Sequence, residues 1–302
     1  MQTQPVNFYS EGARLAGLLH TPDPAPDRMR GVVQGPGWLG LKDARMYGPY
    51  HQALTDAGFA VLIFDYRGFG DSEGSRGRLS PADQLTDLRS AVSYLAARED
   101  IDDDNIGTFG SGGTGGGNVF LLAAVDSRVR AVVSQVPVSD GEDWLRRMRR
   151  EYEWYAFLAE VEEDRRERAT TGRGRLVHPR EDIMVPTPER RASAVKKDVD
   201  GRIPSQVPLA CVDELLAYRP IDAAHGLQTP SMVVAVEDDA TTPTDHATAL
   251  YAALAGPKRL VMQRHTTHYA AYATYGEQIA PLIAEWFDRH LSRTGLECHD
   301  VP

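Results

Sequence analysis

Apolar and polar positions follow one another along the chain in a regular series of short patterns. Residues 60–64 (AVLIF) form a wholly apolar run, which is typical of a strand buried on both faces. Residues 81–97 predict a helix, with Ser80 as its N-cap and Pro81 at its first position. Residues 6–20 alternate in the manner of an antiparallel hairpin. The pattern therefore predicts a chain in which strands and helices are mixed.

Further strand and helix signals alternate through most of the chain. We expect strands at residues 31–34, 106–109, 131–136, 231–236 and 258–262, and helices at residues 47–57, 119–125, 244–254 and 276–290. Strands that alternate with helices form mostly parallel sheets, because each crossover helix covers one face. We therefore expect an α/β fold with a mostly parallel twisted sheet and helices on both faces.

Residues 141–222 interrupt this alternation, because they hold no convincing strand pattern. Apolar side chains recur there at helical spacing: Trp144, Leu145, Met148, Tyr152, Tyr155, Leu158 and Val161. We expect a core built from residues 1–140 and 223–302, and a mainly helical cap built from residues 141–222.

Composition and charge exclude several classes of protein. The formal net charge of −10 lacks the basic signature of a nucleic-acid-binding protein, and it disfavours an anionic membrane surface. Cys211 and Cys298 form no C-x-x-C pair, which argues against a zinc site or a disulfide framework. The first residues lack an apolar signal core, and no stretch has the roughly 18 apolar residues of a membrane span. We expect a soluble cytoplasmic protein with a small-molecule substrate and no metal or organic cofactor; a homodimer is only a general expectation.

The glycine-rich stretch FGSGGTGGGN, residues 109–118, lies between a strand signal and a helix signal. Such a turn either cradles a phosphate or presents a catalytic nucleophile on a sharp elbow. The glycines match G-x-G-x-x-G, but that dinucleotide motif usually opens the first strand–helix unit and needs an acidic residue about 20 positions later. Asp140 matches that requirement only loosely. The elbow is therefore the favoured interpretation.

An elbow needs small residues two positions before and two positions after its nucleophile. Thr114 meets that rule, with Gly112 before it and a glycine after it. Asp239 and His268 each follow a predicted strand, so both should emerge at the carboxyl ends of parallel strands, where such sheets bind ligands. The sequence thus indicates Thr114, Asp239 and His268 as catalytic candidates.

These segments resemble the α/β-hydrolase superfamily over nearly the whole chain. The chain is most similar to its dienelactone-hydrolase and peptidase-like branch, with a helical insertion. The resemblance lies in VVQGPGWLG, AGFAVLIFDYRGFGDSEG and PKRLVMQRHTTHYAAY, and in the order nucleophile, acid, histidine. It implies an α/β-hydrolase fold and two oxyanion-hole amides. One amide would come from Trp38 or a neighbour, and the other from Gly115 if Thr114 is the nucleophile.

The elbow departs from that family, whose members read apolar-Gly-x-Ser-x-Gly-Gly. Counting forward from Ile106 places the serine position at Gly112, and counting backward from residues 123–126 places it at Gly113. Neither residue is a nucleophile. Ser111 and Thr114 flank these positions, Thr114 fitting the spacing and Ser111 being the second candidate. A third alternative is that no side chain attacks the substrate.

Several residues have competing interpretations. His265 is the alternative to His268, and Asp238 is the alternative to Asp239, whose D-x-x-x-P spacing to Pro243 resembles the family acid. A run of arginines could hold a substrate carboxylate, but such runs are more often solvated helix faces: Arg146, Arg147, Arg149 and Arg150. Four aromatic residues of the cap either line a pocket or pack a helix: Trp144, Tyr152, Trp154 and Tyr155.

Three functions fit these residues. The first is an enzyme that acts on a small or medium organic acyl compound (an ester, lactone, amide or C–C bond), such as a natural-product intermediate. It would use His268, Asp239 and a backbone oxyanion site. The second is a lyase, dehydratase or cyclase with the same histidine as acid and base. The third is a ligand-binding pseudoenzyme, although such a protein does not need the His–Asp pair.

Overall fold

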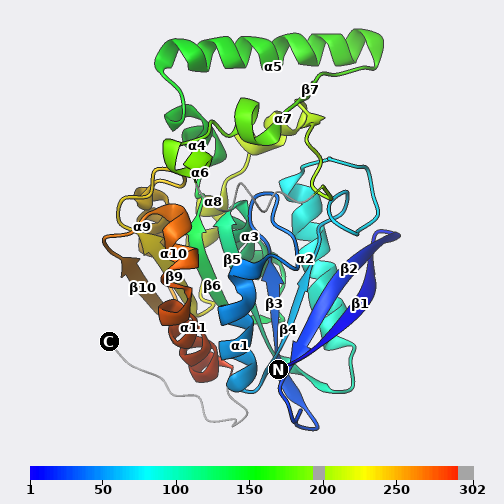
Figure 1. The fold of residues 1–302 in the computed structure, drawn as a ribbon, viewed down its shortest axis with the longest axis vertical. Helices are drawn as coiled ribbons and strands as arrows, with labels where there is room; N and C mark the ends of the chain where they lie inside the picture. The colour runs from blue at the N-terminus through cyan, green and yellow to red at the C-terminus, as the bar shows by residue number, and fades with distance from the viewer. Residues whose placement is uncertain (193–200, 292–302) are drawn as a thin grey trace.

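A computed structural model describes residues 1–192 and 201–291 (Figure 1). Its centre is an eight-stranded sheet in the order β1-β2-β4-β3-β5-β6-β9-β10. β1 and β2 form an antiparallel hairpin on one edge, β2 pairs antiparallel with β4, and the six remaining strands are parallel. The strands are β1 (Gln2–Ser10), β2 (Ala13–Thr21), β3 (Met29–Gly35), β4 (Phe59–Phe64), β5 (Ile101–Gly113), β6 (Val129–Pro137), β9 (Ser231–Val236) and β10 (Lys258–Gln263). The predicted mostly parallel α/β sheet is confirmed.

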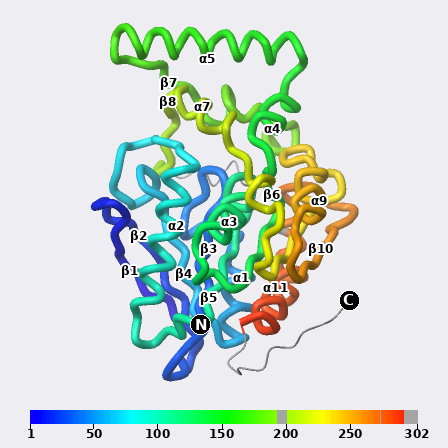
Figure 2. The backbone as a smooth tube through the Cα atoms, turned by 180° about the vertical axis from the view of Figure 1, so that it is seen from behind, coloured from blue at the N-terminus to red at the C-terminus, as the bar shows by residue number. Residues whose placement is uncertain are grey.

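Helices cover both faces of the sheet. α1 and α11 pack on one face, and α2, α3 and α9 pack on the other (Figures 1 and 2). Neighbouring strand residues enter different layers: Val32 belongs to the hydrophobic cluster that includes α1 and α11, and Val33 to the cluster that includes α2, α3 and α9. The helices and the short 3-10 turn of this core are η1 (Arg45–Tyr47), α1 (Gly48–Asp56), α2 (Pro81–Ala96), α3 (Thr114–Val125), α9 (Thr244–Ala253), α10 (His268–Ala273) and α11 (Gly276–His290). None of the helices in the described ranges combines the length and the apolar composition that crossing a bilayer requires.

Local signals set several of these boundaries. The Ser80 hydroxyl accepts a hydrogen bond from the Asp83 N–H at 3.1 Å, so it caps α2 as expected. The strand at residues 231–236 and the helix at residues 276–290 have the predicted bounds. β5 is longer than predicted, because its pairing with β6 continues through the glycine-rich stretch to Gly113.

Between β6 and β9 the chain forms an insertion that lies at one end of the sheet (Figure 1). Its elements are α4 (Gly141–Arg147), α5 (Glu151–Thr171), β7 (Leu176–Val177), a π-helical turn η2 (Pro179–Ile183), α6 (Pro188–Ala192), β8 (Val207–Pro208), α7 (Cys211–Leu216) and α8 (Pro220–Ala224). β7 and β8 form a two-stranded ladder that the sequence did not predict. The predicted boundary between residues 222 and 223 falls inside α8, and the division into core and cap stays a prediction.

The long helix α5 is the outermost element of the insertion (Figures 1 and 2). Trp154, Phe157 and Val161 form its buried stripe, whereas Tyr152 and Tyr155 are exposed. Two helices carry the apolar side chains of residues 144–161, because α4 ends at Arg147 and α5 begins at Glu151.

Two histidines, His20 of β2 and His51 of α1, are buried against each other. The His20 and His51 rings stack with centroids 4.3 Å apart, and His51 Nε2 lies 2.6 Å from Gln34 Oε1. Burial lowers the pKa of His20 to about 4. Burial, followed by the charge of His20, lowers the pKa of His51 to about 3. Both rings are therefore neutral in the folded protein near neutral pH.

This pair predicts an acid-sensitive fold. Because the folded-state pKa values lie below the ordinary 6.5 of histidine, the unfolded chain binds more protons once the pH falls below about 6.5. We expect each histidine to cost about 2 kcal/mol of unfolding free energy between pH 7 and pH 5. Urea unfolding across that range should show a shallower pH slope for the double variant His20→Gln/His51→Gln, and an unchanged slope for the exposed control His225→Gln. Equal slopes in all three proteins would contradict the assignment.

Candidate active site

The glycine-rich stretch forms a sharp turn between β5 and α3. Gly113 is the last residue of β5, with φ of 50° and ψ of −111°, and α3 begins at the next residue, Thr114. A positive φ is costly for residues with a side chain, and it marks the strained corner at which nucleophile elbows present their catalytic residue. The corner residue is therefore Gly113, as one of the two sequence counts indicated.

Close backbone contact explains two neighbouring glycines. A Cβ atom on Gly110 would lie 2.0 Å from the carbonyl oxygen of Gly115, and one on Gly115 would lie 2.5 Å from that of Pro36. Any side chain at either position would force the strand, the helix and the loop after β3 apart. At Gly113, in contrast, the nearest atoms to such a Cβ lie 3.9–4.0 Å away, so the corner has space for a side chain although it carries none.

The predicted acid and histidine are brought together beside this corner. Asp239 follows β9 and His268 opens α10 after β10, so both lie at the carboxyl ends of parallel strands. His268 Nδ1 lies 2.7 Å from Asp239 Oδ2, and both side chains are buried. The Asp239 carboxylate therefore fixes the orientation of the ring through Nδ1, and Nε2 is the ring nitrogen that does not contact it.

Asp239 is itself held by the loop that follows it. Its Oδ1 accepts the N–H groups of Thr241 and Thr242 at 2.7 and 2.8 Å, and its Oδ2 accepts the Thr242 hydroxyl at 2.9 Å. Burial raises the pKa of Asp239, but the charge and hydrogen bond of His268 and these two N–H groups outweigh burial and hold the pKa below its ordinary value. Asp239 is thus an ionised partner for His268. The sequence alternatives Asp238 and His265 are both exposed.

A cavity of about 490 Å³ lies at this end of the sheet, a size suited to a small or medium ligand. His268 and Gly113 line it, together with residues from the loop after β3, from α10 and from the insertion. Trp38 and Trp144 meet edge to face there, with ring centroids 5.4 Å apart, and the Trp144 Nε1–H donates to the Thr241 carbonyl at 2.8 Å. The insertion therefore forms part of the cavity wall.

Only some of the remaining candidate residues from the sequence line this cavity. Ser111 and Trp38 line it, and Ser111 is only 1 % exposed. Thr114 and Gly115 do not line it. Thr114 is 1 % exposed, and its hydroxyl has no hydrogen-bond partner among the described residues. Because Gly113 forms the corner, the backbone amide that follows the corner belongs to Thr114 rather than to Gly115.

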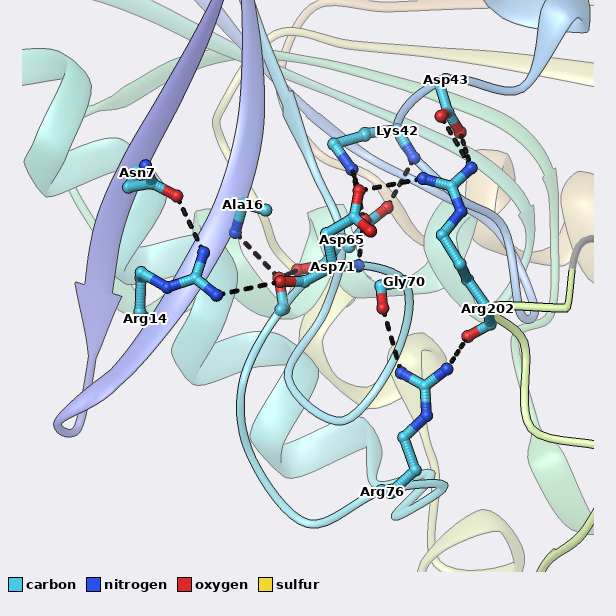
Figure 3. A network of polar contacts seen from close by, with 11 residues as sticks. Asn7, Arg14, Ala16, Lys42, Asp43, Asp65, Gly70, Asp71, Arg76 and Arg202 are labelled. Atoms are coloured by element: carbon cyan, nitrogen blue, oxygen red, sulfur yellow. Dashed lines mark hydrogen bonds and ion pairs between the residues drawn. The ribbon is translucent and has the colours of Figure 1, made fainter.

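A polar network fixes one wall of the cavity to the core (Figure 3). Lys42 Nζ lies 2.7 Å from Asp65 and 2.5 Å from Asp71. Arg202 of the insertion lies 2.7 Å from Asp43 and 2.9 Å from Asp71. Asp65 also accepts the Lys42 and Asp71 N–H groups and so organises the loops that carry these two residues. The carboxylates of this network are therefore matched by cations of the same protein.

Among the arginines and aromatic residues that the sequence singled out in the insertion, one lines the cavity, and others have structural contacts elsewhere. Arg146 pairs with Glu151, and Arg147 pairs with Asp143 and Asp245, so neither faces the cavity. Of the four aromatic candidates only Trp144 lines the cavity. Sequence reasoning missed the cavity residues Tyr272, Arg180 and Arg190. The latter two lie in a proline-punctuated stretch with no strong local pattern.

The sheet order and the helices on both faces of the sheet are those of an α/β hydrolase. The solved α/β hydrolase GrgF from Penicillium has this fold, with a TM-score of 0.79 and 21% identity over 96% of this chain and 99% of that chain. The chain belongs to the X-Pro dipeptidyl-peptidase (S15) family, which it matches over residues 39–270. That range contains the corner, the acid and the histidine, and it places the protein among hydrolase-type enzymes.

Two curated relatives extend this comparison. An uncharacterized 31.7 kDa protein of the traX-finO intergenic region of Escherichia coli is 33% identical over 260 residues, which cover 84% of this chain and 89% of that protein. The quorum-quenching protein AidA of Acinetobacter baumannii is 38% identical over 137 residues, 45% of this chain and 44% of its own length. The first similarity spans most of both chains, whereas the second spans less than half of each.

Proposed function

We propose that the protein hydrolyses a small or medium acyl compound by direct attack of water, with His268 as general base. The observation that carries this proposal is the hydrogen-bonded His268–Asp239 pair beside a cavity whose corner residue, Gly113, has no side chain. The family and the named hydrolases of this fold support the reaction class. The space around Gly113 is where a water molecule can take the place of a serine hydroxyl.

The reaction follows from this arrangement. Nε2 of His268 takes a proton from water, whose oxygen bonds to the acyl carbon, and Asp239 stabilises the imidazolium that forms. The N–H groups of Trp38 and Thr114 then stabilise the oxyanion. Thr114 is the first residue of α3, so its N–H has no acceptor within the helix. Collapse of the intermediate breaks the bond to the leaving group, which takes the proton from His268, so that an acid and an alcohol, thiol or amine are released.

The absence of a side chain at Gly113 also supports a second candidate. A histidine held by a carboxylate, without a nucleophile in the corner, can move a proton between two positions of one substrate. Lyase, dehydratase or cyclase chemistry needs no acyl intermediate and no water as reactant. Attack by Thr114 stays a prediction as well, and its buried hydroxyl would have to reach the cavity.

Oxygen labelling distinguishes these candidates. The protein is incubated with a panel of aryl esters, thioesters and lactones in H₂¹⁸O, and the acid products and the intact protein are analysed by mass spectrometry. We expect one ¹⁸O in the product acid and no acylated protein during turnover. An acyl adduct on Thr114 or Ser111 would show that this side chain, and not water, is the nucleophile. Products without ¹⁸O would favour the proton-transfer reactions, and no turnover of any class would contradict the proposed function.

A further inference from the structure

Arg180 is a cation of the cavity wall that has no anionic partner within the part of the chain that the structure describes. It lies on η2 of the insertion and lines the same cavity as His268. Its Nη2 contacts the carbonyl oxygens of Trp38 and Leu39, both at 3.4 Å, which is long for a hydrogen bond. Among residues 1–192 and 201–291 it forms no ion pair with a carboxylate. A desolvated charge is costly unless it is paired.

Two charged residues of α6, Arg190 and Glu189, lie in the sequence shortly after Arg180. Arg190 of α6 also lines the cavity and donates its Nη1–H to the Arg180 carbonyl at 2.7 Å. Burial, followed by the charge of Arg190, lowers the pKa of Arg180 to about 10. Glu189 is engaged elsewhere, because its carboxylate accepts the Thr267 hydroxyl and the Tyr269 N–H.

Other cations of the same region have the partners that Arg180 lacks among the described residues. Lys42 and Arg202 are paired with Asp43, Asp65 and Asp71 in the network of Figure 3. Arg149 is also desolvated, with a pKa lowered to about 10, but three carbonyl oxygens accept its N–H groups at 2.6–3.0 Å and its guanidinium lies 3.8 Å from the Phe157 ring centre. Arg149 is a structural arginine outside the cavity, whereas Arg180 lies on the cavity wall and its Nε and Nη1 donate to no acceptor among the described residues.

We infer that the substrate carries a carboxylate remote from its scissile acyl group, and that Arg180 binds this carboxylate. This inference rests on the proposed function and names its substrate class: half-esters or half-thioesters of dicarboxylic acids and related acyl acids. A planar guanidinium matches a carboxylate through two parallel hydrogen bonds, and it supplies the one charge that a carboxylate needs. Apolar side chains that also line the cavity, such as Leu39, Met46 and Met184, suit a hydrocarbon chain.

Matched pairs of substrates test this inference. The 4-nitrophenyl half-esters of adipic, pimelic and suberic acids are compared with the same esters carrying a terminal carboxamide, which has the same shape without the charge. We expect the best carboxylate ester to exceed its carboxamide partner about 10- to 100-fold in kcat/KM. Arg180→Gln should reduce that ratio to about one, and Arg180→Lys should retain part of it. The control Arg149→Gln should keep the wild-type ratio.

A binding measurement separates this inference from the reaction. Calorimetric titration with the free dicarboxylates and their diamides needs no turnover. Dicarboxylate binding that is lost in Arg180→Gln, without hydrolysis of any ester, would support the anion site and reject the hydrolase. Hydrolysis with equal rates for both members of every pair, or a carboxylate preference that survives in Arg180→Gln, would overturn the inference and leave the hydrolase intact. Equal binding of dicarboxylates and diamides would also overturn it.

Discussion

Replacement of His268 by alanine is expected to lower kcat for acyl hydrolysis by about 10²- to 10⁴-fold, the usual contribution of a positioned general base. His268 is the ring that faces the cavity, and its Nδ1 is held 2.7 Å from the buried Asp239 carboxylate. Asp239→Asn should cause a loss in the same range, because an amide cannot stabilise the imidazolium. Steady-state kinetics on the preferred ester, with melting temperatures recorded in parallel, checks both variants.

His265 offers a matched control for this experiment. It lies three residues before His268 but is exposed and does not line the cavity, so His265→Ala should retain wild-type kinetics. The melting temperatures matter most for Asp239→Asn, because Asp239 also organises the loop at Thr241 and Thr242. A correctly folded His268→Ala variant with undiminished kcat would exclude His268 as the base.

Introduction of a serine at Gly113 is expected to create a covalent catalyst from a chain that has no nucleophile in its corner. The new hydroxyl would lie beside His268, in a space where the nearest atoms to the added Cβ are 3.9–4.0 Å away. We expect Gly113→Ser to react with a fluorophosphonate and to gain one adduct by intact-protein mass spectrometry, while the wild type stays unlabelled. The positive φ should cost about 1–2 kcal/mol of stability.

The neighbouring glycine provides the control. Gly112 also has a positive φ, and a Cβ there would lie 3.4 Å from the Tyr272 hydroxyl, so Gly112→Ser bears a similar backbone strain with its hydroxyl one residue away from the corner. It should remain unlabelled. Labelling of the wild-type protein that disappears in Thr114→Ala or Ser111→Ala would instead identify a native nucleophile and refute attack by water. A folded but unreactive Gly113→Ser variant would show that the corner is not poised for catalysis.

Much of the fold could be predicted from the sequence, because the local patterns of apolar and capping residues agree with the final packing. The wholly apolar run near residues 60–64 became β4, a strand buried on both faces, and Ser80 capped α2 where its side chain predicted. The insertion was less readable. The spacing of its aromatic residues spans two helices, α4 and α5, which are separated by residues 148–150. That spacing does not distinguish the exposed Tyr152 and Tyr155 from the buried Trp144 and Trp154. Short elements that pack over a sheet, such as η2 and α6, have no repeating pattern of their own.

The sequence by itself determined the alternating sheet, its hydrolase-like order and the position of Asp239 and His268 after late strands, because each depends on patterns within a few residues. Only the tertiary structure decided that Gly113 is the corner, since a run of glycines permits several registers and the packing of Gly110 and Gly115 selects one. Only the fold brings Arg180 to the cavity of His268. Residues far apart in the chain meet where strand ends and insertion pack together, and no local pattern encodes that contact.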